Sequence, residues 1–358
     1  MSELIEDVRA GGLLREGRAV VVMYSGGRDS TCLLDVAVRV AGPAAVSALH
    51  VNYGLRAGAD SDERHCAELC ERLGVQLDVR RPVRRAAGAK SGGNLQAWAR
   101  DERYRAAADL AVAREADVAA GHTRSDQVET ILYRIASSPS RRALLGMRPR
   151  DGALIRPLLR FTREQTGEYC KRRGLRWRDD ESNDSAAYAR NRIRRELVPA
   201  LERAHPAAQD NLLALAEILR AEAEVLDELV DGVLGGRAEI SLATLRELAP
   251  ALRRLVVQRL ADDAAGGPAA GVARRADDVA AMGDRAALDL PSGVRATTEA
   301  GVVRFGRTER RDDSAPARKA RLDAERAGQA ERGASVRAGA PHTQHNKGAE
   351  PPPTLDSQ

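Results

Sequence analysis

Residues 24–30 read YSGGRDS, and this stretch decides the fold expected for the chain. The apolar run at 19–23 precedes it and predicts a buried strand, while the apolar spacing over 31–38 predicts a helix. A strand, a turn with two glycines and a helix N-terminus form a cradle for an anion, because glycine lets the backbone approach closely and the first helical N–H groups lack acceptors. The sequence therefore predicts a phosphate-binding loop that contains Gly26 and Gly27.

The polar side chains of this loop suggest which phosphate chemistry it serves. Ser25 and Ser30 add hydroxyl donors, whereas Asp29 would repel a phosphate unless a cation lies between them, so we predict Asp29 as a Mg²⁺ ligand. The stretch lacks the Gly-Lys-Ser/Thr ending of a Walker loop. It resembles the SGGxDS loop of ATP pyrophosphatases, which adenylate an oxygen and release pyrophosphate. An ordinary glycine-rich turn is the alternative, and the fixed offsets of the two serines and the aspartate favour phosphate binding.

Composition limits the class of protein. The chain has 358 residues, a net charge of +5 and a pI of about 9.2, which permits a polyanionic partner. None of its four cysteines forms a CxxC pair, so zinc and iron–sulfur clusters are not expected, and Cys66 and Cys70 are interpreted as core residues. We find no signal peptide and no apolar run of 18 residues, and we expect a cytoplasmic protein with no membrane segment.

The order of apolar runs predicts an α/β fold. Runs at 19–23, 45–51, 75–79 and 117–120 alternate with helical patterns at about 30–40, 59–73, 94–115 and 125–136. This alternation indicates a parallel sheet with helices on both faces. We expect a catalytic domain over 1–207, whose last part is basic, and a small, mostly helical domain over 208–307. The second domain is predicted to end in a short hairpin at 288–306, and 308–358 reads as a disordered tail.

Two further segments follow predicted strands and should lie at the same sheet edge as the loop. His50 and Val51 end the second strand, where backbone groups would read an adenine base; a plain strand end is the alternative. Asp126 and Glu129 share one face at a helix start after the fourth strand. These two carboxylates suit the binding or deprotonation of an ammonium group, and the alternative is ordinary helix capping.

The motifs, taken in order, resemble those of the tRNA(Ile)-lysidine synthetase family. The resemblance covers about residues 17–205, and the helical part after 208 is similar to the short form of that family. The matching motifs are SGGRDS (25–30), HVNYGLR (50–56), NLQAWARDERY (94–104), GHTRSDQVET (121–130) and DDESNDSAAYARNRIR (179–194). Where family members commonly have a second histidine and a second aspartate in the fourth-strand motif, this chain has Thr123 and Ser125, for which we predict no role.

The resemblance implies an adenine nucleotide alpha-hydrolase-like fold and a specific reaction. ATP adenylates the C2 oxygen of the wobble cytidine in tRNA(Ile) with a CAU anticodon, and the ε-amine of L-lysine then displaces AMP to give lysidine. The implied catalytic residues are Asp29, His122, Asp126 and Glu129. The implied ATP-binding residues are Ser25, Gly26, Gly27, Arg28, Asp29, Ser30, His50, Val51 and Arg100, and the implied tRNA-binding residues are Arg190, Asn191, Arg192 and Arg194.

Two other functions compete with this interpretation. A 2-thiolation enzyme with the same loop would need a catalytic cysteine or a cluster with CxxC spacing, which the cysteines at 32, 66, 70 and 170 do not offer. A nucleotide- or RNA-binding module without chemistry would not need the acids at 29, 126 and 129. The implied cofactors are ATP and Mg²⁺, and the sequence leaves the oligomeric state open between a monomer and a homodimer.

Overall fold

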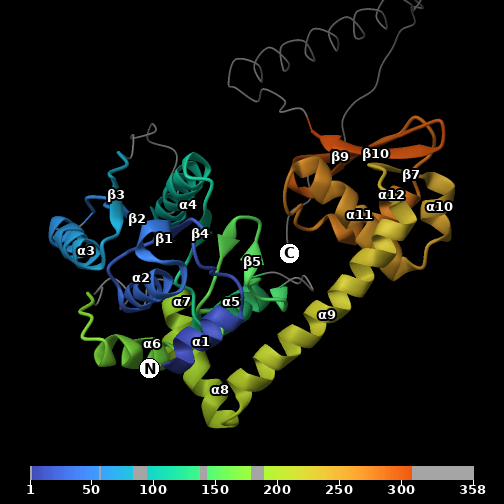
Figure 1. Cartoon of the computed structure of the whole chain (residues 1–358). Helices are drawn as coiled ribbons and strands as arrows, with labels where there is room; N and C mark the ends of the chain where they lie inside the picture. The colour runs from blue at the N-terminus through green and yellow to red at the C-terminus, as the bar shows by residue number, and fades with distance from the viewer. Residues whose placement is uncertain (1, 56–57, 84–94, 138–142, 179–188, 309–358) are drawn as a thin grey trace, which may run out of the picture. The chain divides into compact units, whose positions relative to one another are not determined.

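A computed structural model describes residues 2–55, 58–83, 95–137, 143–178 and 189–308 (Figure 1). The chain divides into two compact units, Met1–Val225 and a second that begins at Leu226. The division falls within helix α9 (Ala208–Leu234), whereas the sequence-based division starts the second domain at residue 208. Except for Thr308, the predicted tail lies outside the described residues.

A six-stranded sheet with the order β3-β2-β1-β4-β6-β5 forms the centre of the first unit. Every neighbouring pair is parallel except β5 with β6. The predicted α/β class and the four predicted strands are confirmed, while the short strands β5 and β6 were not predicted. The strands are β1 (Val20–Met23), β2 (Val46–Val51), β3 (Gln76–Arg80), β4 (Asp117–Ala119), β5 (Arg150–Asp151) and β6 (Leu154–Ile155).

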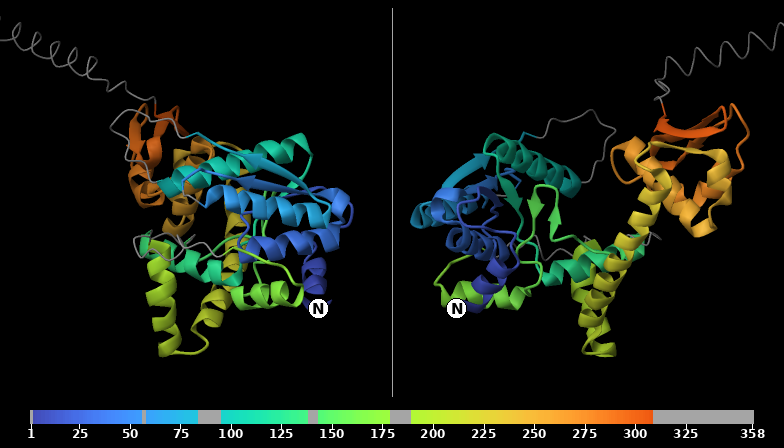
Figure 2. Two further views of the ribbon diagram at one scale, coloured as in Figure 1. Left: turned by 90° about the vertical axis from the view of Figure 1, so that its left-hand side faces the viewer. Right: turned by 45° about the vertical axis from the view of Figure 1, so that its right-hand side comes forward.

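Helices cover both faces of this sheet, as predicted (left panel of Figure 2). The four helical patterns expected between the strands appear as α2 to α5, each with ends close to those expected. The helices of the first unit are α1 (Ser2–Ala10), α2 (Arg28–Ala41), α3 (Ala59–Leu73), α4 (Leu95–Ala113), α5 (Arg124–Ser137), α6 (Arg163–Arg172), α7 (Ala189–Arg192), α8 (Val198–Ala204) and the start of α9, with a π-helical turn at Ile193–Leu197.

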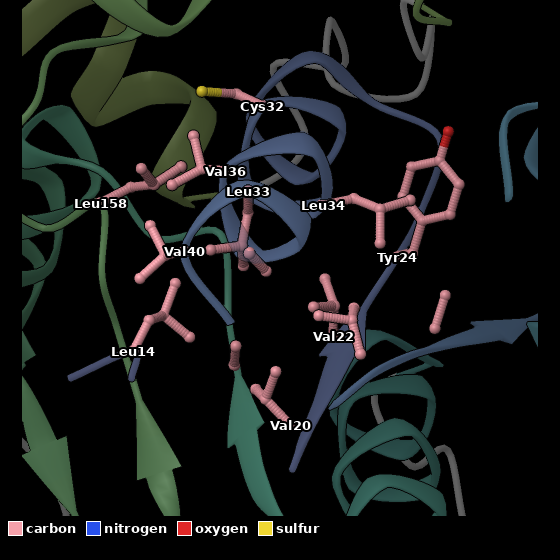
Figure 3. Close-up of a cluster of buried hydrophobic side chains, with 14 of the residues drawn as sticks. Leu14, Val20, Val22, Tyr24, Cys32, Leu33, Leu34, Val36, Val40 and Leu158 are labelled. Atoms are coloured by element: carbon pink, nitrogen blue, oxygen red, sulfur yellow. The ribbon is translucent and has the colours of Figure 1, made fainter. Parts of the chain in front are cut away.

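The alternation of side chains along β1 explains the two layers. Val20 and Val22 enter a core cluster with α2 and α3, and Figure 3 shows Val22 beside Tyr24 and Leu34 in that cluster. Val21 and Met23 point the other way, into a cluster with α4. Because side chains alternate with period two, a strand this apolar must be covered on both sides, which is typical of a parallel sheet.

The second unit has its own core around an antiparallel sheet of order β7-β10-β9-β8. The predicted hairpin at 288–306 is therefore part of a larger sheet, in which β10 pairs with β9 on one side and with β7 on the other. The elements are β7 (Glu239–Ser241), α10 (Leu242–Glu247), α11 (Pro250–Ala265), α12 (Ala276–Ala280), β8 (Ala287–Leu290), β9 (Val294–Glu299) and β10 (Val302–Arg307). Across the described ranges, no helix is both long and apolar enough to cross a bilayer.

Candidate active site

The loop after β1 is held in shape by its two serines. Ser30 Oγ donates to Gly27 O at 2.9 Å and accepts from Ser25 N at 3.3 Å, and the two serine hydroxyls are 3.0 Å apart. The Ser30 hydroxyl has one proton, which it donates to the loop backbone. In this conformation the side chain therefore stabilises the loop and offers no donor to a ligand. Gly27 is the N-cap of α2 and no side chain caps the helix there, which leaves its first N–H groups to meet an anion.

Two glycines allow the loop to lie against its neighbours. Gly26 has a φ of 81°, and a Cβ built on it would lie 3.0 Å from Cys66 Sγ on α3. A Cβ on Gly121, just after β4, would lie 3.1 Å from Ser30 N. The end of β4 therefore touches the start of α2, and the predicted meeting of the two segments at one sheet edge is correct.

The three predicted acids gather around one guanidinium, that of Arg163. Its Nη2 lies 2.7 Å from Asp126 Oδ1, its Nη1 lies 3.3 Å from Glu129 Oε1, and its Nε lies 3.5 Å from Asp29 Oδ2. The Glu129 carboxylate is nearly buried and also receives a fork from Arg194, at 2.6 and 3.1 Å. Asp29, Asp126 and Glu129 are thus one cluster beside the phosphate loop.

Asp29 is fixed from two helices. Its Oδ1 accepts from Thr166 Oγ1 on α6 at 2.5 Å and from its neighbour Arg28 at 3.3 Å. Within the ranges the structure describes, no three histidine, cysteine or carboxylate side chains are grouped to hold a metal ion. Since Mg²⁺ is commonly held by one or two carboxylates together with substrate phosphates and water, the partly exposed Asp29 carboxylate fits a shared ion of that kind.

Asp126 is both a helix-capping residue and a carboxylate of the acid cluster, the two roles between which the sequence did not decide. Its Oδ2 accepts from Thr123 N and Thr123 Oγ1, both at 2.8 Å, which is a capping contact at the start of α5. Its Oδ1 faces Arg163. Burial raises the pKa of Asp126, but Arg163 and the Thr123 hydrogen bonds outweigh it and bring the pKa below the ordinary value. Thr123, for which no role was predicted, therefore orients this carboxylate.

His122 lies among cations and is held neutral. Burial lowers its pKa to about 4, with Asp126 opposing the shift and Arg156, Arg100 and Arg103 adding to it. Its Nδ1 is buried without a hydrogen-bond partner, as are Arg103 Nε, Tyr104 Oη and Arg156 Nε. Unpaired buried polar atoms are costly, so these four atoms, near β4 and α4, are suited to hydrogen-bond with water or with a polar ligand. The predicted residue Arg100 belongs here, with its Cζ 4.6 Å from the Tyr104 ring centroid.

The two residues predicted to read adenine face opposite sides of the sheet. His50 is buried, and its Nδ1 lies 3.0 Å from Tyr24 O and 3.4 Å from Cys66 Sγ. Its side chain is therefore part of the packing between β1 and α3, and the expected adenine contact would have to come from its backbone. Val51 is half-buried on the α4 side.

The predicted tRNA-binding residues differ in their burial and in their contacts. Arg194 is forked onto Glu129, and Asn191 is buried, while Arg192 is exposed. The side chain of Arg190 and residues 179–188 lie outside the described part of the chain. Arg194 therefore holds a carboxylate of the acid cluster, in addition to any contact with nucleic acid.

Sequence reasoning missed Arg163, the residue that joins the acids. The pattern Thr162-x-x-Gln165 is a capping box, and it could have located the start of α6. The contacts of Arg163 span 34 and 37 residues to Glu129 and Asp126, which no local spacing reveals.

Comparisons with known proteins identify the family of the chain. A model of the PP-loop domain family matches residues 1–201. A tRNA(Ile)-lysidine synthase from Burkholderia mallei is 38% identical over 232 residues, covering 60% of this chain and 45% of that protein. One from Symbiobacterium thermophilum is 36% identical over 325 residues, covering 83% of this chain and 67% of that protein.

A solved structure supports the fold alone. The U34-tRNA thiolase NcsA from Methanococcus maripaludis, with its 4Fe-4S cluster, has a TM-score of 0.50 and 16% identity, and the match covers 61% of this chain and 78% of that one. This chain spans about half the length of the first curated relatives it matches, with 45% coverage of the Burkholderia protein. The family match and the Symbiobacterium relative together show that the chain belongs to the tRNA(Ile)-lysidine synthase family of PP-loop proteins.

Proposed function

We propose that this chain ligates L-lysine to C2 of the wobble cytidine of tRNA(Ile) with a CAU anticodon, using ATP and Mg²⁺. The product, lysidine, pairs with A, so the codon read changes from AUG to AUA. The observation that carries the proposal is the convergence of Asp29, Asp126 and Glu129 on Arg163 beside a phosphate-binding loop. The enzyme would act in the cytoplasm, where its tRNA is used.

The first step would occur at the loop. The cytidine O2 forms a bond to the α-phosphorus of ATP, and the bond to pyrophosphate breaks. The N–H groups at the start of α2 suit the phosphates, and Gly26 and Gly121 let the loop lie close to α3 and to the end of β4. Mg²⁺ held by Asp29 would neutralise the charge on the phosphates. A wobble base lies in a single-stranded loop and can be turned into a pocket at low cost.

The second step would occur at the other two acids. Asp126 and Glu129 suit the ε-ammonium of lysine, which must lose a proton before its nitrogen attacks C2. The new C–N bond then replaces the C–O bond to AMP, which leaves. A neutral His122 helps this step, because it adds no positive charge where an ammonium must enter.

The cysteines argue against the thiolation alternative. All four are free and buried. Burial raises the pKa of both Cys66 and Cys70 to about 12, so neither is a thiolate at neutral pH. A binding module without chemistry would have no use for three acids held by shared arginines, and we therefore favour the ligase.

The test uses the full chain with ATP, Mg²⁺, L-lysine and a tRNA(Ile) transcript that has a CAU anticodon. We expect pyrophosphate release that depends on the tRNA, and lysidine in the digested nucleosides. A methionine tRNA with the same anticodon is the matched substrate control. Sulfur incorporation, or nucleotide binding without pyrophosphate release, would contradict the proposal and favour one of the two alternatives.

A further inference from the structure

Arg163 occupies an unusual place for a cation. It is the first residue of α6, where the helix dipole disfavours positive charge, and its side chain is only 18% exposed. It is held there by three carboxylates from two other helices, one nitrogen facing each acid. In this position the guanidinium offsets the repulsion among the three carboxylates.

The charges of this cluster balance. The three carboxylates of Asp29, Asp126 and Glu129 meet three guanidinium groups, those of Arg28, Arg163 and Arg194. A further cation that enters must compete for oxygens that already have donors. A lysine ammonium that enters therefore leaves the cluster with an excess positive charge unless one of the arginines moves away from its acid.

The geometry indicates which arginine exchanges. Arg194 makes two short bonds to Glu129, at 2.6 and 3.1 Å, and such a fork is costly to break. Arg28 contacts Asp29, away from the other two acids. Arg163 instead makes one contact to each acid. It can therefore leave one acid and keep its contacts to the other two.

The contacts of Asp126 also indicate that Arg163 is the arginine that exchanges with lysine. Its Oδ2 already accepts two hydrogen bonds from Thr123, and its Oδ1 accepts from Arg163 Nη2 at 2.7 Å. An ammonium that approaches this carboxylate would meet Oδ1, the oxygen that Arg163 occupies. The guanidinium and the substrate ammonium thus compete for the same atom.

We infer that Arg163 is a positioning residue that holds the place of the lysine ammonium in the free enzyme and yields it when lysine binds. The inference rests on the proposed function, because it takes Asp126 and Glu129 as the lysine site. In the free enzyme Arg163 keeps three like charges together. Arg163 also lowers the affinity for lysine, because each lysine that binds must displace its guanidinium.

The test measures the lysine dependence of transfer from tRNA that wild-type enzyme has already adenylated in the absence of lysine. In Arg163→Gln the competitor is gone and the acids remain, so the KM for lysine should fall by roughly tenfold, the lower end for a charge-assisted contact. Arg172→Gln removes an exposed arginine from the same helix and should keep the wild-type KM. Structural damage would raise KM or lower kcat, so a lowered KM distinguishes the inference from damage.

An unchanged or raised lysine KM in a folded Arg163→Gln protein overturns the inference. If that variant does not fold, Arg163→Lys replaces it, since its ammonium keeps the charge but cannot span three acids; a two- to threefold fall in KM is then expected, and an unchanged or raised KM contradicts it. Failure of the wild type to make lysidine is a different result, which would count against the proposed function itself.

Discussion

Replacement of Glu129 by glutamine should separate the two proposed chemical steps. The side chain is nearly buried and accepts three contacts, two from Arg194 and one from Arg163. Glutamine has nearly the same shape, but one of its two end groups is an amide N–H that cannot accept a hydrogen bond from a guanidinium. The Arg194 fork therefore loses one bond, and the cluster gains one unit of positive charge.

The expected effect on transfer follows from that charge. An entering lysine ammonium would meet the same arginines with one carboxylate fewer. Loss of one charge-assisted contact costs about 1.5–3 kcal/mol, which is about 10- to 150-fold in lysine affinity or transfer rate. In the proposed mechanism, adenylation uses Asp29 and the loop, and it should therefore persist. Adenylated tRNA should accumulate, and higher lysine should partly restore the product if the defect lies in binding.

The assay is a single-turnover reaction that follows adenylated tRNA and lysidine separately. Glu168→Gln is the matched control, because Glu168 is 65% exposed on α6 and lies 3.6 Å from Arg172. It should match the wild type in both steps, since exposed ion pairs contribute little. If Glu129→Gln lowers adenylation as much as lysidine formation, Glu129 serves ATP or the metal, and its assignment to lysine is wrong.

Three other changes test the metal ligand, the neutral histidine and the C-terminal segment. Asp29→Ala should reduce pyrophosphate exchange to below about 10% of wild type in a folded protein, because it removes the proposed Mg²⁺ ligand; higher exchange would refute the metal assignment. His122→Gln should flatten the pH dependence of stability: with the pKa lowered from 6.5 to about 4 in the folded state, the unfolded chain gains the proton first as pH falls, and wild type should lose about 2 kcal/mol between pH 7 and pH 5 that the variant keeps. If urea unfolding gives wild type and variant the same change in the free energy of unfolding between the two pH values, His122 is not buried in its neutral form. Deletion of 312–358 should leave activity nearly unchanged, since this segment has few large apolar residues, and a tenfold loss would instead indicate that it binds tRNA.

Local patterns were enough to predict four of the six strands in the sheet of the first unit. Strands buried on both faces read as continuous apolar runs, so β1 and β2 were found within one residue of their ends. Strands β5 and β6 have two residues each, which is too short for any periodicity to appear. The sheet of the second unit was reduced to a hairpin, because β7 has three residues and joins β10 from about 60 residues away.

The candidate site was predictable in its members but not in their contacts. The acids follow strands or begin helices, so topology alone brings them to one edge. His50 shares strand parity with Ala48, which lies in the core cluster with α2, and that parity could have predicted its inward direction. The link through Arg163 could not be found, since it joins α6 to acids at sequence separations that only the folded chain closes.

We propose that one site first adenylates the wobble cytidine of the tRNA and that the ε-amine of lysine then displaces AMP there. The most direct test incubates wild-type protein with labelled ATP, Mg²⁺ and tRNA(Ile) with a CAU anticodon, with lysine omitted. We predict that AMP becomes attached to the wobble cytidine, and that added lysine converts this nucleoside to lysidine as AMP is released. Absence of the adenylated tRNA, with ATP unconsumed or with AMP attached to lysine instead, would contradict it.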